Sequence, residues 1–245
     1  MKNSLTRRLN MKIDLTSSNP ALESIFSNPS QIITLDANFL IPPDRSIFGI
    51  RSFDFNTFER IWLAPIFKSF PNLAIHESVY DELISPTVKD YIKATINDIP
   101  PRLSVHKDSS LTSEERILRD SIEATISPYT KYDPMLNNKD DRGEVKSLSY
   151  IAVKGLLYFA AHDYNAIQLV KKSEEWNIGL DNVQSIQMYE LLFYLYKAGI
   201  CDKKNLKILY KYQYYLTKNE KSINLEWGKF VKRMEALYPI NFIQE

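Results

Sequence analysis

The feature that most constrains the fold is an apolar run in the segment 32–40 that ends abruptly at a carboxylate, Asp36. Four apolar or β-favouring residues without polar alternation precede it, as in a parallel strand covered on both faces. Ligands of open α/β sheets bind at the carboxyl ends of strands, which makes Asp36 a candidate metal ligand or catalytic acid. Taken alone, Asp36 is better explained as the cap of a short helix beginning near Asn38. A functional interpretation therefore depends on matching acids elsewhere.

A second apolar run, 155–161, also ends on an acid, in the sequence His162-Asp163. Helix capping explains either aspartate singly. It explains the pair less well, because the carboxyl ends of parallel strands share one edge of the sheet. Further strands are predicted at 72–75, at 103–106 on an edge, and at 177–180.

Two helical segments carry additional acids. In 76–83, Glu82 lies beside the apolar stripe of Val79 and Leu83, an unusual position for an acid unless it binds something. The alternative is a solvated helix residue, and for Glu82 alone that alternative is favoured. Glu77 lies in the first turn, where acids interact favourably with the helix dipole.

The second acid-bearing segment opens a helix with Asp140, Asp141 and Glu144. Capping and dipole effects explain acids in a first turn and contribute ~0.3–1 kcal/mol each. Clustered carboxylates nevertheless repel one another, and a divalent cation among them relieves that repulsion.

Composition narrows the chemistry. The chain of 245 residues has three histidines, one cysteine and six glycines. Dinucleotide and P-loop glycine motifs are absent, and zinc sites built on His and Cys have too few ligands at suitable spacing. Carboxylates are hard oxygen ligands that select Mg²⁺ or Mn²⁺ over zinc. The acids therefore indicate metal-dependent hydrolysis.

The single cysteine and the lack of an apolar run after the N-terminal arginines predict a cytoplasmic protein with no membrane partner. Residues 1–30 are predicted to be an irregular lead-in with a short helix at 21–26. Further helices are predicted at 53–67, from Pro86, and from a capping box at Thr112.

The C-terminal part, 183–245, is predicted to be a helical extension, with helices at 183–198, 202–217 and 223–238. Between residues 190 and 235 it carries ten Lys or Arg against five Asp or Glu. Bases such as Lys207 and Lys211 interleave with aromatics such as Tyr212, which suits single-stranded nucleic acid. The alternative is an amphipathic appendage with packed aromatics and solvated lysines, and that alternative is somewhat favoured.

Taken in order, the motifs around Asp36, Glu82, Glu144 and Asp163 resemble those of the PIN-domain ribonucleases, which include toxins of bacterial toxin–antitoxin pairs. The resemblance covers roughly 31–180. It implies a three-layer α/β/α sandwich with a central parallel sheet, a Mg²⁺ or Mn²⁺ site and endonucleolytic cleavage of RNA. The four acids would be the metal ligands and catalytic residues, and Asn38 would orient a ligand or water.

The resemblance places the nuclease domain at 31–182. Glu77 is an alternative to Glu82, and Asp140 or Asp141 to Glu144. His162 stands where the family often has Ser or Thr near its last acid; it is either a phosphate contact or a packed strand-end residue.

An antitoxin or other protein partner and a homodimer are compatible with the resemblance. One rival is a haloacid dehalogenase-type phosphatase, which needs a second Asp where Asn38 stands. The other is a catalytically inactive PIN-fold module that binds RNA or protein.

Overall fold

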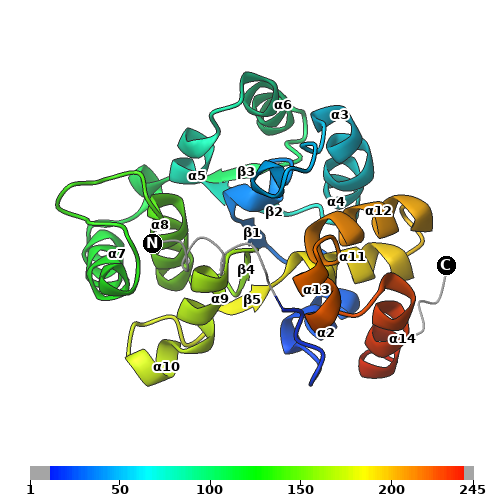
Figure 1. Ribbon diagram of the computed structural model, residues 1–245. Coiled ribbons are helices and arrows are strands. Elements are labelled where there is room, and N and C mark those ends of the chain that lie inside the picture. Colours follow the sequence, from blue (N-terminus) through cyan, green and yellow to red (C-terminus); the bar gives the residue numbers. More distant parts are fainter. Residues whose placement is uncertain (1–11, 240–245) are drawn as a thin grey trace. The chain divides into compact units, whose positions relative to one another are not determined.

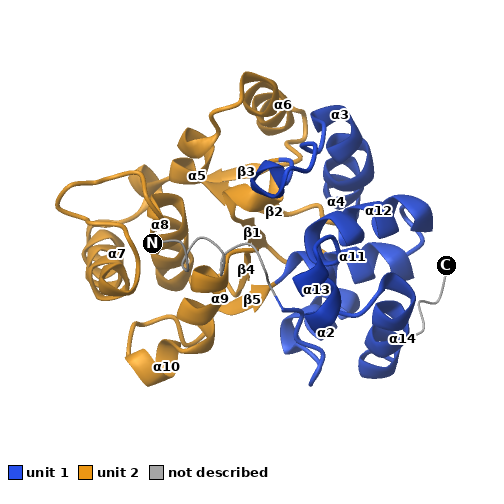
Figure 2. Cartoon of the chain, viewed as in Figure 1, with its two compact units in different colours: residues 1–29, 42–69, 187–245 blue, residues 30–41, 70–186 orange. Residues whose placement is uncertain are grey.

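The computed structural model describes residues 12–239, so the predicted lead-in before residue 12 and the extension beyond residue 239 lie outside the described residues. The chain forms two compact units (Figure 2). Unit 1 takes the described residues of 1–29, 42–69 and 187–245, and unit 2 takes 30–41 and 70–186.

Unit 2 is built on a five-stranded sheet in the order β3-β2-β1-β4-β5 (Figure 1). Every neighbouring pair of strands is parallel. The strands are β1 Ile33–Leu35, β2 Leu73–His76, β3 Ser104–His106, β4 Tyr158–Ala160 and β5 Gln184–Ile186. The predicted α/β class with a parallel sheet is confirmed.

The apolar runs of the sequence explain the central strands. All residues of β1, β2 and β4 are buried, as expected for strands without polar alternation. The edge strand β3 is partly exposed, which also agrees with its predicted place.

The strand predicted at 177–180 is wrong. Gly179 there has a φ of +77°, a left-handed conformation that interrupts an extended strand. Ile178 and Leu180 are nevertheless buried. The sequence of this buried apolar turn therefore resembles that of a short strand. The fifth strand is β5, at the start of the segment 183–198 for which the sequence predicts a helix; the helix there, α11, begins only at Met188.

The two acid-bearing helices of unit 2, α5 (Glu77–Glu82) and α8 (Arg142–Val153), pack against each other. α8 also packs against β2 and α7 (Ser113–Ile126). The others are α6 Pro86–Asn97, α9 Tyr164–Lys171, α10 Ser173–Trp176 and the short helices η1 Ala37–Phe39, η4 Asp108–Ser110 and η5 Ser127–Tyr129. The capping box predicted at the start of α7 is confirmed: Thr112 Oγ1 accepts from the Glu115 amide, and Glu115 accepts from the Thr112 amide.

Unit 1 is helical in its described part. It comprises α2 Pro20–Ser27, η2 Ser46–Phe48, α3 Phe55–Phe58, the π-helical η3 Glu59–Leu63, α4 Ala64–Ser69, α11 Met188–Lys197, α12 Lys203–Tyr214, α13 Lys218–Ile223 and α14 Trp227–Leu237. The short helix predicted at 21–26 corresponds to α2. The helix predicted at 223–238 begins later, because Thr217 caps a separate helix, α13, that ends at Ile223.

The segments that make up unit 1 differ from the predicted division of the chain at 31–182 and 183–245. Segment 42–69 groups with the C-terminal helices and not with the sheet. The buried Arg45 guanidinium shows why, since it forms an ion pair with Glu220 and donates to the Gln213 carbonyl. These contacts hold segment 42–69 to α12 and α13.

Candidate functional site

The strand order places a topological switch point between β1 and β4. From β1 the chain continues to β2 and β3 on one side, and it returns to β4 and β5 on the other. Crevices at such points, outside the carboxyl ends of the strands, are where α/β sheets bind ligands. Asp36 directly follows β1, and its amide donates to the Ala160 carbonyl at the end of β4 (2.9 Å). Asp163 follows β4 by three residues.

Asp36 is only 5% exposed. It precedes η1 but makes no side-chain capping bond to that helix; instead, Oδ2 accepts from Asn38 Nδ2 at 2.7 Å. Burial raises the pKa of Asp36 to about 6, and the charge of Asp163 adds to that rise, against the hydrogen bonds from Ala37 and Asn38. The Asn38 side-chain hydrogen bond and the interaction with the Asp163 charge are features that capping alone does not require.

Glu82 lies at the end of α5 and is half-buried, next to the buried Val79 and Leu83. Its Oε1 accepts from the amide of Gly143 at 2.6 Å. Burial raises the pKa of Glu82 to about 7, with the Asp36 charge contributing, against the Gly143 hydrogen bond.

The lack of a side chain at residue 143 makes room for that carboxylate. A Cβ there would lie 2.7 Å from Glu82 Oε1. The motif Arg142-Gly143-Glu144 therefore contributes the acid Glu144 and, at Gly143, both the amide and the space that accommodate the Glu82 carboxylate.

Asp163 does cap a helix. Its Oδ1 accepts from the Asn165 amide at 2.7 Å, at the start of α9. Capping is thus a sufficient explanation for the position of this residue, but its charge also reaches Asp36. His162, beside it, is half-buried.

The third acidic position has several occupants. Glu144 is buried in the first turn of α8, next to Gly143. Asp141 has a φ of 56°, its Oδ2 accepts from the Lys131 amide, and its charge contributes to the raised pKa of Glu82 after burial and the charge of Asp36. Asp140 is exposed. The alternatives among these acids stay open.

The charges of several predicted acids influence one another, but their carboxylate oxygens do not converge on a single position. Asp36 interacts with both Glu82 and Asp163. Within residues 12–239, however, no three of the predicted acids offer ligand atoms that all lie within 4.8 Å of one another. The donor atoms are all carboxylate oxygens, which are the ligands that a hard divalent cation prefers. The raised pKa values of Asp36 and Glu82 and the space that Gly143 leaves for the Glu82 carboxylate are compatible with such a cation.

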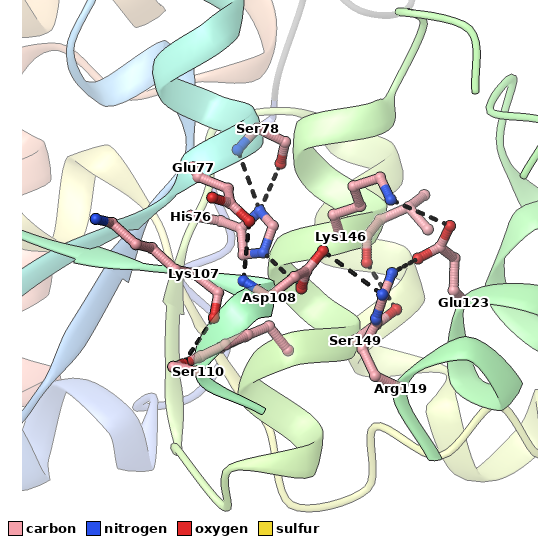
Figure 3. Close-up of polar contacts among 12 residues, drawn as sticks. His76, Glu77, Ser78, Lys107, Asp108, Ser110, Arg119, Glu123, Lys146 and Ser149 are labelled. Carbon is pink, nitrogen blue, oxygen red and sulfur yellow. Dashed lines mark hydrogen bonds and ion pairs between the residues drawn. The ribbon is translucent and has the colours of Figure 1, made fainter. Parts of the chain in front are cut away.

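A different group does meet that spacing. His76, Glu77 and Asp108 each offer a ligand atom, and these atoms all lie within 4.8 Å of one another (Figure 3). His76 ends β2 and is fully buried, while Glu77 and Asp108 are half-buried. Burial acts to raise the pKa of Asp108, but the His76 hydrogen bond and the charges of His76, Arg119 and Lys146 together hold it below its usual value.

Sequence reasoning missed this group, although a signal was present. His76 and Asp108 each follow closely on the end of a predicted strand, as Asp36 and Asp163 do. Polar residues that follow parallel strands gather at one edge of the sheet, and this holds for His76 and Asp108 as it does for the acids after β1 and β4. The sequence pattern explains Glu77 as a first-turn acid or as an alternative to Glu82, and neither interpretation pairs it with His76.

The predicted RNA-binding residues lie in unit 1. Lys207 and Lys211 are exposed on α12. Tyr212 is half-buried, its hydroxyl donates to the Arg51 carbonyl, and its ring packs edge-on against Phe53. Most of the neighbouring aromatics, Tyr210, Tyr214 and Trp227, are buried. The lysines are therefore available for phosphate contacts, whereas these rings serve mainly in packing.

Comparison of the chain with protein-family models, with curated proteins and with solved structures found no match. Among the helices of residues 12–239, none is both long and apolar enough to cross a lipid bilayer.

Proposed function

We propose that the protein is a metal-dependent endoribonuclease of the PIN type, which hydrolyses RNA phosphodiester bonds with Mg²⁺ or Mn²⁺. The observation that carries the proposal is that Asp36 and Asp163 follow the neighbouring parallel strands β1 and β4 at the switch point of the sheet. The charge of Asp163 contributes to the raised pKa of Asp36, and the charge of Asp36 to that of Glu82. Asp36 is buried, and Glu82 and Asp163 are half-buried. Carboxylates that interact with one another away from bulk water are unfavourable unless a positive charge joins them.

The order and setting of the motifs support the PIN assignment. Asp36 and Asp163 follow parallel strands. Glu82 lies at the end of α5 and Glu144 in the first turn of α8, in the sequence order that suggested the family. Parallel sheets occur almost always with both faces covered, and the central strands are fully buried. A three-layer α/β/α sandwich is the architecture that fits.

In the proposed site, Asp36, Glu82, Glu144 and Asp163 would hold the cation. When bound, Mg²⁺ or Mn²⁺ activates a water and stabilises the leaving oxygen of the phosphodiester. Asn38 fixes the Asp36 carboxylate through its 2.7 Å hydrogen bond. The Gly143 amide does the same for Glu82, so two of the four acids are oriented before a cation arrives.

The alternative is a catalytically inactive PIN-fold module that binds RNA or protein. A pure scaffold gains nothing from keeping Asp36 buried and charged, because a neutral isostere would stabilise it. The raised pKa values of Asp36 and Glu82 therefore favour the enzyme. A toxin role with an antitoxin partner, a cytoplasmic location and a homodimer form part of the same proposal.

The test is cleavage of an end-labelled single-stranded RNA with Mn²⁺, and of DNA of the same sequence. Wild type is compared with Asp36→Asn and Asp163→Asn, and with Asp90→Asn as a matched control at an exposed position on α6. We expect metal-dependent RNA cleavage by wild type and the control, reduced by at least ~10²-fold in both site variants. Wild type that neither binds Mn²⁺ nor cuts RNA, while both site variants are more stable, would support the scaffold.

A further inference from the structure

The cluster of His76, Glu77 and Asp108 lies at the carboxyl ends of β2 and β3, in the part of the sheet that the proposed nuclease site does not use (Figure 3). His76 Nε2 lies 3.2 Å from Asp108 Oδ1, and the Asp108 amide donates to Glu77 Oε1 at 2.9 Å. Imidazole nitrogen and two carboxylates are a donor set that suits borderline transition metals.

The burial of the three residues suits a site that a small ion can enter. The imidazole is fully buried, whereas both carboxylates are partly exposed, with 23% of the Asp108 side chain accessible. A cation entering from solvent meets the carboxylates first and then the nitrogen.

Ser78 holds the imidazole in place from its other side. Its Oγ lies 2.7 Å from His76 Nδ1, and its amide also points to Nδ1, at 3.2 Å. Histidines that bind metals donate their second ring N–H to an acceptor. In the structure the Ser78 amide instead donates to Nδ1, so metal binding at Nε2 requires a protonated Nδ1 that donates to Ser78 Oγ. A hydroxyl can donate or accept, so Ser78 can accept from a protonated Nδ1 when the Nε2 lone pair is needed for a metal.

The charges around the cluster leave room for a dication. Arg119 lies beyond Asp108 from His76 (Figure 3), 3.6 Å from Asp108 Oδ2, and it binds Glu123 and Asp120 more closely, at 2.7 and 3.1 Å. Lys146 also pairs with Glu123. Two cations therefore face four carboxylates, those of Glu77, Asp108, Asp120 and Glu123. The local balance is negative with a neutral imidazole.

We propose that His76, Glu77 and Asp108 bind one divalent transition-metal ion of the Zn²⁺ class, at a site separate from the Mg²⁺ or Mn²⁺ site of the proposed nuclease. The ion would take the place of the hydrogen bond between His76 and Asp108. The imidazole would change tautomer, losing its Nε2 proton to solvent and gaining one on Nδ1, whose N–H would then donate to Ser78 Oγ. Because the ligands come from β2, α5 and the segment after β3, the bound ion ties the edge strand to its neighbour.

The experiment is calorimetric titration of the chelator-treated full chain with ZnCl₂, with a thermal melt in parallel. The key variants are Asp108→Asn and Glu77→Gln, which keep side-chain size at partly exposed positions and so avoid altering the buried His76. We expect one site in wild type whose affinity falls at least ~10-fold in each variant. A 100-fold excess of Zn²⁺ over Kd raises the Tm of wild type by roughly 5 °C or more, and this rise is lost in the variants.

Two further variants make the test specific. Ser78→Ala should weaken Zn²⁺ binding by roughly 10-fold, because only the backbone amide then faces Nδ1 and the proton stays on Nε2. Asp120→Asn removes the same charge beside Arg119 at a position 61% exposed, without removing a ligand, and should bind Zn²⁺ like wild type.

The proposal is overturned if wild type binds no Zn²⁺, if Asp108→Asn and Glu77→Gln bind it as wild type does, or if Asp120→Asn loses as much affinity as they do. Loss of Zn²⁺ binding in Asp36→Asn would assign the ion to the nuclease site instead. Mn²⁺-dependent RNA cleavage is measured separately, so the failure of either proposal leaves the other standing.

Discussion

Asp36 carries a pH-dependent penalty that its asparagine variant should remove. Its pKa is about 6 in the folded protein against an ordinary 3.8, mainly through burial. A raised carboxyl pKa means that the contribution of Asp36 to stability is complete below about pH 4 and is lost as the pH rises through about 6. In metal-free buffer, Asp36→Asn should therefore unfold like wild type at pH 4 and be more stable by roughly 2–3 kcal/mol at pH 8.

Urea denaturation at the two pH values checks this. Asp90→Asn, at an exposed position, is the control and should follow wild type throughout. Asp36→Asn that is less stable than wild type at pH 8 would mean that the fold needs the ionised carboxylate, which contradicts the expected sign. Adding Mn²⁺ should stabilise wild type more than the variant.

Replacing Gly143 with alanine should affect the activity of the proposed site much more than the stability of the protein. Alanine favours a helix over glycine by roughly 1 kcal/mol, but a Cβ at residue 143 would lie 2.7 Å from Glu82 Oε1. The carboxylate is the far end of a flexible side chain, so it moves away. Gly143→Ala should stay within about 1 kcal/mol of wild type and lose at least ~10-fold in Mn²⁺-dependent cleavage.

The matched control for this variant is Gly228→Ala in α14, where an added Cβ meets nothing within 4 Å. It should gain roughly 0.5–1 kcal/mol and cleave as wild type does. Full activity in Gly143→Ala would show that the position of Glu82 over α8 does not matter for the reaction.

Single residues were predictable where their signal was local. Asp36 stands out because a buried strand ends directly before it, and the sequence alone shows that. The pairing of His76 with Asp108 joins residues 32 positions apart, and no local pattern encodes it. The seat that Gly143 provides for Glu82 is likewise a contact between elements, 61 positions apart.

At the scale of elements, capping chemistry and apolar periodicity worked where they acted together. The start of α7 follows from Thr112 and Glu115, whose reciprocal hydrogen bonds are present. The false strand at 177–180 had apolar residues but also Gly179, whose left-handed φ a strand does not adopt. The true strand, β5, is only three residues long, too short for alternation to distinguish it from a helix start.

The ion pair between Arg45 and Glu220 is the element-scale contact whose loss should matter most. Both side chains are buried, and Glu220 also accepts from the Leu216 and Thr217 amides at the start of α13. Glu220→Gln leaves the Arg45 charge buried without its counter-ion, and we expect a loss of roughly 3–5 kcal/mol.

Denaturant unfolding measures this loss, and the double variant Arg45→Met/Glu220→Gln should recover part of it, since neither buried charge remains. The exposed pair Arg102 and Asp98 provides the comparison. Asp98→Asn should change stability by less than about 1 kcal/mol. Equal effects at the two pairs would contradict the role of burial.

At the scale of the whole molecule, the sequence pointed to successive segments, whereas the units are interleaved. Segment 42–69 leaves unit 2 after η1 and packs in unit 1, and the chain then returns for β2. Its apolar residues predicted a helix with a buried face, which is present. Helical periodicity tells that a face is buried but not which partner buries it, so the grouping with the C-terminal helices was beyond sequence reasoning.

The basic helices of unit 1 give the prediction that concerns the molecule as a whole. Lys207 and Lys211 are exposed on α12. If both contact RNA phosphates, the double variant Lys207→Glu/Lys211→Glu should bind single-stranded RNA more weakly than wild type. The slope of log K against log salt concentration should become shallower by about 1.4, which is the contribution of two phosphate contacts on a single strand. Cleavage at saturating RNA should be unchanged, because neither lysine belongs to the acid site.

The control is Lys229→Glu/Lys232→Glu on α14, which makes the same change in net charge. An equal loss of RNA affinity in both double variants would indicate overall electrostatic attraction and no specific contact by α12. RNA affinity that stays unchanged at low salt in the α12 variant would remove this helix from RNA binding, and substrate recognition would then be left to unit 2.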